Sequence, residues 1–544
     1  MPCYHPNLRY YDNSWCIPTD ELLSPEVCVY GGTAAGVVAA VTAAEEGKSC
    51  VLLHPGHILG GMTTGGLSYT DLGNAHAIGG SARRFYERLG SHYGKEIAWT
   101  FEPHVAAEEL SRMLAASKVE VRRGCFLASV TRDGDGSHAT GTGRRNASGG
   151  TPGRITEIAC TNGLRVAAQV YIDAGYEGDL AASAEVPYTV GRESRDTYDE
   201  QYAGVQIHKS HQFDVDVSPF VEAGNPQSGY LPNVRHTGLA RPEDAPIGAA
   251  DASVQAYNFR VCMTKAPELR IPFPKPAGYE RSHYVLAERW LRSTSEDIFR
   301  KFDMVTETKT DTNNHGAVST DFIGGNHAFP EADFATRELI FQEHVLYQMG
   351  LHWFMANDPA VPEEIRTRYA AWGLSNDEFT ATGNWPHQLY IREARRILGD
   401  AVVTEHECMG RRRCDDPIGM AAYQMDSHNC NRRSFGGLVR NEGDVQVKLP
   451  APYGISYKAI VPPVGSCTNL YVPVCLSASH IAFGSVRMEP VFMILAESSA
   501  VAACMAVDTG RTVQEIGYGA LEKRLLERGQ VLRTDIENSD RINP

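Results

Sequence analysis

The sequence lacks the short motifs of several common enzyme classes. No Cys-x-x-Cys pair occurs among its 13 cysteines, and G-x-S-x-G, H-E-x-x-H and G-x-x-x-x-G-K-[ST] are also missing. These absences remove the sequence signals of a dithiol disulfide reductase, an elbow hydrolase, a zincin protease and a P-loop enzyme. Cys28, Cys50 and Cys504 lie within apolar runs, where a thiol behaves as a small hydrophobic group. This pattern suits a reducing compartment.

Basic residues and long apolar runs are also scarce. The chain has 51 Lys and Arg against 66 Asp and Glu, a formal net charge of -15. A surface that tracks phosphates needs clustered Lys and Arg, so we expect no nucleic-acid partner. The N-terminus shows no apolar core of a signal peptide, and the apolar stretch 491–507 is interrupted by Glu497, Ser498 and Ser499. That stretch is too short and too polar to span a bilayer, and we expect a cytoplasmic protein without a membrane segment.

The chain is long enough for about three folding units. With 544 residues, 42% of them apolar, the chain can bury a large core. The pattern changes to Pro-rich loops and longer helical stretches after about residue 195, which predicts an inserted second domain. We expect a discontinuous α/β domain at residues 25–195 and 400–532, an inserted domain at 196–399, a flexible surface loop at 133–154 within a long hairpin, and an N-terminal arm at 1–24.

The clearest unit is a strand, a glycine turn, a helix and a strand within residues 25–54. The turn is Gly31, Gly32, Thr33, Ala34, Ala35 and Gly36. In such a βαβ unit the glycines let the backbone approach a nucleotide pyrophosphate at the helix N-terminus. Thr33 replaces the middle glycine of the usual pattern, and His54 stands where a ribose-binding Asp or Glu is expected. A purely structural tight turn is the alternative interpretation.

Three further segments are rich in small residues. Residues 60–66 contain four glycines in seven positions, which favours backbone pressed against a planar ligand such as a flavin, although a flexible loop without a ligand would also fit. Residues 171–181 read as a strand that ends in a small-residue turn and an acid. Residues 476–490 lead into the last helix, and Pro490 in its first turn would direct the positive helix end toward the N1 and C2 region of a flavin.

Together these four segments resemble the FAD-dependent oxidoreductase family of the glutathione-reductase-like flavoprotein superfamily. The resemblance covers residues 25–532 and implies a Rossmann-like domain with FAD as the cofactor. It places residues 31–36 at the pyrophosphate, His54 at the ribose, and residues 60–66 along the ribityl chain and flavin. The cofactor-binding residues implied beyond the pyrophosphate turn are His54, Pro55, Gly60, Gly61, Met62, Thr63, Gly65, Gly66, Leu67, Ala174, Gly175, Asp179, Ser479, Met488 and Glu489.

Five side chains are candidates for binding or deprotonating a substrate. His480 is the first, because it lies in the segment that leads to the flavin-facing helix, and histidine is a common general base. His315 and His387 lie in polar and aromatic stretches that could line a pocket. Arg392 could bind a substrate carboxylate, and Tyr457 could donate to a substrate oxygen. For each of them a structural role is the alternative.

The sequence therefore predicts a flavoenzyme that oxidises or desaturates a small organic substrate by hydride transfer to flavin N5. No second nucleotide fingerprint follows a strand, so we expect reoxidation by dioxygen or a diffusing acceptor. Two alternatives stay open: a flavoprotein that catalyses a redox-neutral isomerisation, elimination or cyclisation, and a non-catalytic nucleotide-binding scaffold. No metal site is expected, and the oligomeric state is left open.

Overall fold

A five-stranded parallel sheet forms the centre of the α/β part of the protein. The computed structural model describes residues 4–133, 153–232 and 246–534. The strand order is β22-β8-β2-β3-β4, with β2 at Val27–Tyr30, β3 at Cys50–His54, β4 at Glu120–Arg123, β8 at Val170–Asp173 and β22 at Leu470–Tyr471. All neighbouring pairs in this sheet are parallel. Helix α1 (Ala34–Glu45) connects β2 to β3, which confirms the predicted βαβ unit.

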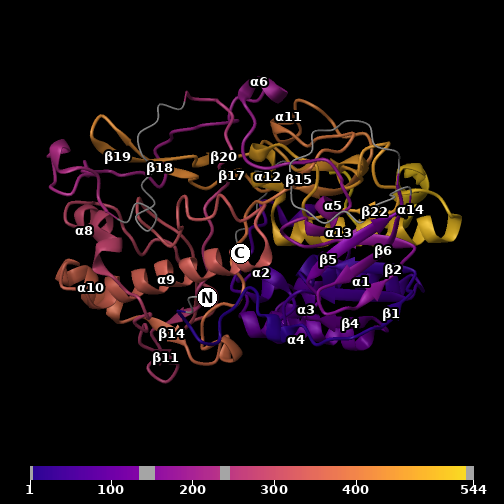
Figure 1. Cartoon of the computed structure of the whole chain (residues 1–544), viewed down its shortest axis with the longest axis horizontal. Helices are drawn as coiled ribbons and strands as arrows, with labels where there is room; N and C mark the ends of the chain where they lie inside the picture. The colour runs from indigo at the N-terminus through magenta and orange to yellow at the C-terminus, as the bar shows by residue number, and fades with distance from the viewer. Residues whose placement is uncertain (1–3, 134–152, 233–245, 535–544) are drawn as a thin grey trace.

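Small side chains bring two helices together beside this sheet. Helix α13 (Glu489–Thr509) packs along α1, and both are rich in Ala, with Gly36, Ser498 and Ser499 buried as well. Small residues permit a short distance between helix axes, which fixes α13 firmly in the core. In Figure 1 the sheet and α1, α3 (Gly80–His92) and α4 (Pro103–Ala116) lie on the right, with α13 above them.

The length of α13 corrects one expectation. Within the described residues it is the one helix that is long and apolar enough to cross a membrane by length and composition, so this segment is not too short or too polar for a span. However, 89% of its apolar window is buried inside the protein. Its apolar character is therefore explained by its position as a core helix.

A second sheet carries the hairpin that was expected around residues 133–154. Its order is β1-β7-β6-β5, and β5 (Leu127–Arg132) pairs antiparallel with β6 (Ile155–Cys160). The predicted hairpin is confirmed by this pairing, while residues 134–152 of the predicted flexible loop lie outside the described residues. Strand β1 (Leu22–Leu23) of the N-terminal arm joins this sheet beside β7 (Arg165–Val166).

The segment 196–399 builds the left half of Figure 1 around the long helix α9 (Phe334–Asn357). A hairpin from beyond this segment, β18 (Asn431–Phe435) with β19 (Leu438–Glu442), packs against it. The amide of Val439 donates to the carbonyl of Val217 at 2.9 Å. The two predicted units therefore interlock at this hairpin, and the proposed domain boundaries stay a prediction.

The remaining elements are shorter. The helices are α2 (Gly61–Thr64), α5 (Asp179–Ser183), α6 (Arg195–Tyr198), α8 (Val285–Leu291), α10 (Glu363–Ala370), α11 (Glu405–Cys408), α12 (His480–Val486) and α14 (Tyr518–Glu527). The strands are β9 (Tyr188–Thr189), β10 (Met263–Thr264), β11 (Arg270–Ile271), β12 (Phe302–Met304), β13 (Thr310–Thr312), β14 (Gly373–Ser375), β15 (Arg396–Ile397), β16 (Pro417–Ala421), β17 (Met425–Ser427), β20 (Val445–Val447) and β21 (Tyr453–Ser456).

Candidate functional site

A cavity of about 290 Å³ opens at the carboxyl end of the parallel sheet. Its wall is formed by residues 31–33 after β2, residues 54–58 after β3, the turn after β8, residues 387–389, and the N-terminal arm. In open α/β sheets ligands bind at this edge, where the turns after neighbouring strands meet. The structure thus brings the predicted glycine turn, His54, Pro55 and Gly175 to one site.

The glycine turn is shaped by close backbone packing. Gly31 has φ +104°, and a Cβ atom there would lie 2.4 Å from the nitrogen of Gly175. A Cβ on Gly36 would lie 1.9 Å from the carbonyl oxygen of Gly31. The hydroxyl of Thr33 donates to the carbonyl of Ala174 at 2.8 Å and accepts from the amide of Gly36 at 3.1 Å. Threonine is accommodated at the middle position because its side chain caps α1 and hydrogen-bonds to the turn after β8.

His54 is a neutral hydrogen-bond acceptor for this turn. The last residue of β3, it accepts the amide hydrogen of Gly32 on Nδ1 at 3.1 Å. Burial lowers the pKa of His54 to about 4, against an opposing backbone hydrogen bond with Ile58. The ring is therefore uncharged near neutral pH, and Nε2 carries its hydrogen. His54 positions the glycine turn, and its contact with a ribose stays a prediction.

The glycine-rich segment after β3 is partly helical, since α2 covers Gly61–Thr64. A Cβ on Gly61 would lie 2.2 Å from the hydroxyl of Tyr176, and one on Gly66 would lie 1.9 Å from the carbonyl oxygen of Arg260. Packing against protein therefore accounts for these two glycines without a ligand. The predicted contact of this segment with a flavin stays a prediction.

An ion pair in the segment 196–399 holds the chain just beyond α2. Asp311 accepts the backbone amides of Ser68 and Tyr69 on Oδ2, both at 2.9 Å. Arg260 pairs with the same carboxylate through two bonds of 2.7 and 2.8 Å. The two amides and the guanidinium all donate to an ionised carboxylate, and such charge-assisted hydrogen bonds are stronger than those between neutral groups. The loop after the glycine-rich segment is thereby fixed by residues from the other half of the molecule.

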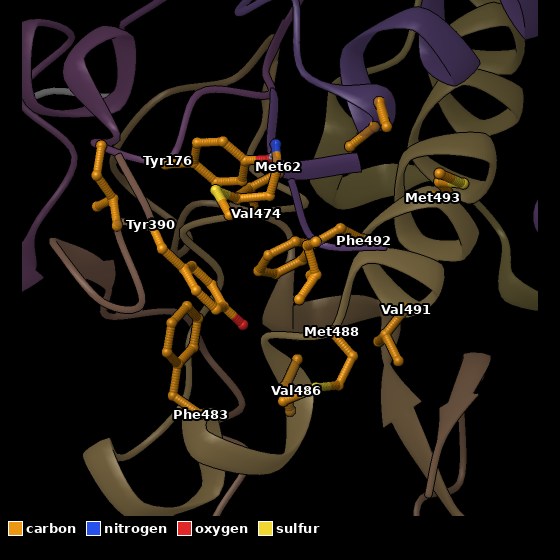
Figure 2. Close-up of a cluster of buried hydrophobic side chains, with 14 of the residues drawn as sticks. Met62, Tyr176, Tyr390, Val474, Phe483, Val486, Met488, Val491, Phe492 and Met493 are labelled. Carbon is orange, nitrogen blue, oxygen red and sulfur yellow. Dashed lines mark hydrogen bonds between the residues drawn. The ribbon is translucent and has the colours of Figure 1, made fainter. Parts of the chain in front are cut away.

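Three of the predicted motifs meet at the carboxylate of Glu489, at the N-terminus of α13. Thr63 of α2 donates its hydroxyl to Oε2 at 2.6 Å, and Tyr176 of the turn after β8 donates to Oε1 at 2.8 Å. The hydroxyl of Tyr176 also accepts the amide of Met62 at 2.9 Å. Burial raises the pKa of Glu489. Figure 2 shows Met62 beside Tyr176 in a buried cluster that also includes Phe492 and Met488.

Asp179 forms ion pairs with two arginines. Arg337 of α9 forms bonds of 2.7 and 2.8 Å with its two oxygens, and Arg395 adds one of 2.8 Å. Burial disfavours the charged carboxylate, but the two guanidinium groups outweigh it and lower the pKa of Asp179 to about 2. Asp179 lines the cavity as an ionised group that is already paired with protein.

His480 has a protein partner on each ring nitrogen. Nδ1 lies 2.8 Å from Oε2 of Glu393, and Nε2 lies 3.0 Å from Oγ of Ser427. Glu393 is itself held by Nε of Arg396 at 3.2 Å. Ser479 precedes His480 and caps α12 with its side chain. The arrangement is a buried hydroxyl, imidazole and carboxylate in line, with His480 only 2% exposed.

The two other histidine candidates have different surroundings. His387 lines the cavity, burial lowers its pKa to about 3, and its buried Nε2 has no hydrogen-bond partner among the described residues. His315 has its Nε2 3.4 Å from Oε2 of Glu296, and burial lowers its pKa as well. The structure therefore brings His387, but not His315, to the cavity wall with His54.

Arg392 and Tyr457 are both engaged by buried groups. Arg392 lies 2.9 Å from Oδ1 of Asp321, and its guanidinium stacks over the ring of Tyr390 at 4.6 Å. The hydroxyl of Tyr457 lies 2.8 Å from that of Tyr471 and donates to a backbone carbonyl. Neither residue is part of the described cavity wall. Their predicted substrate contacts stay predictions.

Sequence reasoning missed a buried network around Tyr390. Arg487 donates to the hydroxyl of Tyr390 at 2.9 Å and lies 3.4 Å from Asp426. His428 lies 3.6 Å from Asp426 and 2.7 Å from Asp321, so the network continues to Arg392 through Asp321. Burial disfavours a charged Asp426, but His428 and Arg487 lower its pKa well below the usual range. The sequence singled out Arg392 and the segment that contains Arg487, whereas Asp321, Asp426 and His428 were not among its candidates.

One group of potential metal ligands occurs in the part of the chain that the structure describes. Glu102, His104 and Glu378 could present their ligand atoms to one ion. The ammonium of Lys309 lies 2.7 Å from Glu102 and 2.9 Å from Glu378. This buried lysine already supplies the positive charge that a metal ion would bring.

Comparison with known proteins finds one family. A family model described as FAD dependent oxidoreductase matches residues 26–525. No curated protein matches the chain. Solved structures align over about a third of the chain. Thioredoxin reductase from T. acidophilum has 17% sequence identity over 28% of this chain and 34% of that chain, with a TM-score of 0.16. THI4 from Thermovibrio ammonificans has 14% identity over 31% of this chain and 66% of that chain (TM-score 0.22), and 3-ketosteroid-delta4-(5alpha)-dehydrogenase from Rhodococcus jostii RHA1 has 14% identity over 30% and 50% (TM-score 0.20). Such low TM-scores carry no information about the reaction of this chain.

Proposed function

Because the chain belongs to the FAD-dependent oxidoreductase family, we propose that it oxidises or desaturates a small organic substrate. FAD is the cofactor and supplies the hydride acceptor. The protein's own part is to hold the cofactor, orient the donor carbon and accept a proton from an alcohol or amine. We further propose that a diffusing acceptor or dioxygen regenerates the cofactor, and that the protein acts in the cytoplasm.

The observation that carries this proposal is the convergence on Glu489. It joins α2, the turn after β8 and the N-terminus of α13, three segments that are far apart in the sequence. The residues present also fit a dinucleotide, because the cavity includes the glycine turn at the start of α1. The unpartnered Nε2 of His387 is a buried polar atom that a ligand in this cavity would satisfy.

His480 remains our proposed proton acceptor, and its hydrogen-bond partners suggest a path by which the proton reaches it. Glu393 is placed to hold the hydrogen of Nδ1, so that Nε2 faces the hydroxyl of Ser427 as an acceptor. We propose that Ser427 takes the proton released by the substrate and passes its own hydroxyl hydrogen to Nε2. In this scheme Glu393 is a positioning residue that fixes the ring, as the acid does in a serine–histidine–acid triad.

The test is anaerobic reduction of the bound flavin by candidate substrates, read from its absorbance. We expect His480→Ala and Ser427→Ala to retain flavin and to slow reduction about 10²- to 10⁴-fold, the usual effect of losing a general base. His76→Ala, which changes an exposed histidine, serves as the matched control. If His480→Ala keeps both the flavin content and the reduction rate of the wild type, the assignment is wrong.

The same experiment separates the alternative functions. Substrate turnover without oxygen and without bleaching of the flavin would indicate a redox-neutral isomerisation, elimination or cyclisation. A purified protein that is colourless and stays so with added FAD would indicate a non-catalytic nucleotide-binding scaffold. Colour that stays in the pellet after acid precipitation would mean that the flavin is covalently attached.

A further inference from the structure

We infer that the N-terminal arm, here residues 4–15, completes the cofactor site, and that Arg9 supplies the positive charge facing the pyrophosphate of FAD. This inference rests on the proposed function, since it takes FAD as the occupant of the cavity. The arm precedes the first strand of the parallel sheet, outside the βαβ unit that usually holds a dinucleotide.

Buried side chains of α9 anchor the arm. Glu338 accepts the backbone amides of Tyr10 and Tyr11 on Oε2, at 2.7 and 3.0 Å. Gln342, one turn further along α9, donates to the carbonyl of Leu8 at 2.8 Å. Both anchors are almost fully buried, which makes these hydrogen bonds expensive to lose.

From α9 the arm crosses to the turns after β8 and β3. The hydroxyl of Tyr10 donates to Glu177 at 2.9 Å. The ring of Trp15 lies edge-on to His57, with centroids 4.8 Å apart. Tyr10, Trp15, Glu177 and His57 all line the cavity, together with Arg9 directly before Tyr10. The arm therefore forms one wall of the site, across from the sheet.

Arg9 is the only Lys or Arg among the described residues that line the cavity. Its nearest carboxylate oxygens are those of Glu338 at 3.7 Å and Asp12 at 3.9 Å, both longer than a hydrogen bond. Its Nη1 donates to the carbonyl of Leu8 at 3.4 Å and its side chain is 26% exposed, so the guanidinium keeps further N–H donors for a ligand. A planar guanidinium with five N–H donors matches phosphate oxygens well.

The glycine turn creates the need for such a residue, because three of its six amides donate within the protein. The amide of Gly31 donates to the carbonyl of Leu53 at 2.9 Å. The amide of Gly32 donates to His54, and that of Gly36 to Thr33. The turn thus offers fewer donors to two negative phosphates than a glycine turn with free amides would. Arg9 makes up this deficit with a full positive charge.

The experiment compares ligands with and without a pyrophosphate on the full-length protein freed of flavin. Dissociation constants for ADP and adenosine are obtained by competition with FAD fluorescence quenching. We expect Arg9→Ala to weaken ADP and FAD binding about 10- to 100-fold, as for one lost charge-assisted hydrogen bond, while adenosine binding changes less than about twofold. Arg9→Lys should recover most of the loss.

Two control variants make the result specific. Arg83→Ala removes the same charge from α3 and should change neither ligand. Glu338→Gln loosens the whole arm and should weaken adenosine as well as ADP. Equal losses of ADP and adenosine affinity in Arg9→Ala, or no loss for either ligand, would overturn the inference. The proposed function would still stand in that case, provided that the wild-type protein binds FAD. A wild-type protein that binds no FAD would overturn both.

Discussion

The protonation state of His54 leads to a measurable dependence of stability on pH. Its pKa is lowered to about 4 in the folded protein, against an ordinary value of 6.5. Because the unfolded chain binds the proton more tightly, the stabilisation is present above pH 6.5 and is lost as the pH falls toward 4. With 1.36 kcal/mol per pKa unit, the free energy of unfolding should fall by about 2 kcal/mol between pH 7 and pH 5 from this residue alone.

The substitution His54→Asn isolates this contribution. The Oδ1 atom of asparagine stands at the same number of bonds from Cα as Nδ1 of histidine, so it can accept the amide hydrogen of Gly32 without titrating. We expect the variant to resemble the wild type at pH 7 and to be more stable than it by about 2 kcal/mol at pH 5. The stability that is lost because other groups titrate is the same in the wild type and the variant, so it cancels when their free energies of unfolding are subtracted.

Urea unfolding of the flavin-free full-length protein at the two pH values measures the difference. His76→Asn is the matched control, because it makes the same substitution at an exposed histidine. Equal loss of stability on acidification in the wild type and in His54→Asn would refute the assignment of His54 as a neutral acceptor.

Two further substitutions test the packing around the site by urea unfolding. Gly36→Ala should destabilise the protein by about 3 kcal/mol or more, because the new Cβ would lie 1.9 Å from the carbonyl oxygen of Gly31. Gly519→Ala, in α14, should be neutral or stabilising by up to about 1 kcal/mol, because no atom lies within 4 Å of the added Cβ. Similar losses of stability in Gly36→Ala and Gly519→Ala would refute the packing explanation. Glu489→Ala should cost about 2 to 4 kcal/mol, since it leaves the hydroxyl hydrogens of Thr63 and Tyr176 without an acceptor, whereas Glu489→Gln should cost much less. Equal effects of these two would show that the hydrogen bonds at position 489 contribute little.

The sequence predicted those parts of the fold that depend on nearby residues. The strand, turn, helix and strand of residues 27–54 follow from local spacing, and they appear with boundaries shifted by a few residues at most. The longer helical stretches expected after about residue 195 include α9. In each case the apolar pattern and the flanking Gly or Pro act over a few residues, so the signal lies in one short segment.

The contacts that build the site could not be predicted in this way. Thr33 departs from the usual pattern, and only the position of Ala174 shows that its side chain serves as a cap and a bridge. The ion pairs of Asp179 join it to Arg337 and Arg395, more than 150 residues away. Partners at such separations are selected by tertiary packing, and no spacing rule in a single sequence reports them.

The closure of the parallel sheet by its last strand has a consequence for biosynthesis. β22 and α13 are made only after residue 469, yet β22 pairs with β8 and α13 covers α1. While a ribosome is still translating the middle of the chain, one edge of the sheet is open and Tyr176 has no Glu489 to bind. Such an edge is a site for wrong pairing between chains. Premature termination before residue 469 would therefore release a chain prone to aggregate.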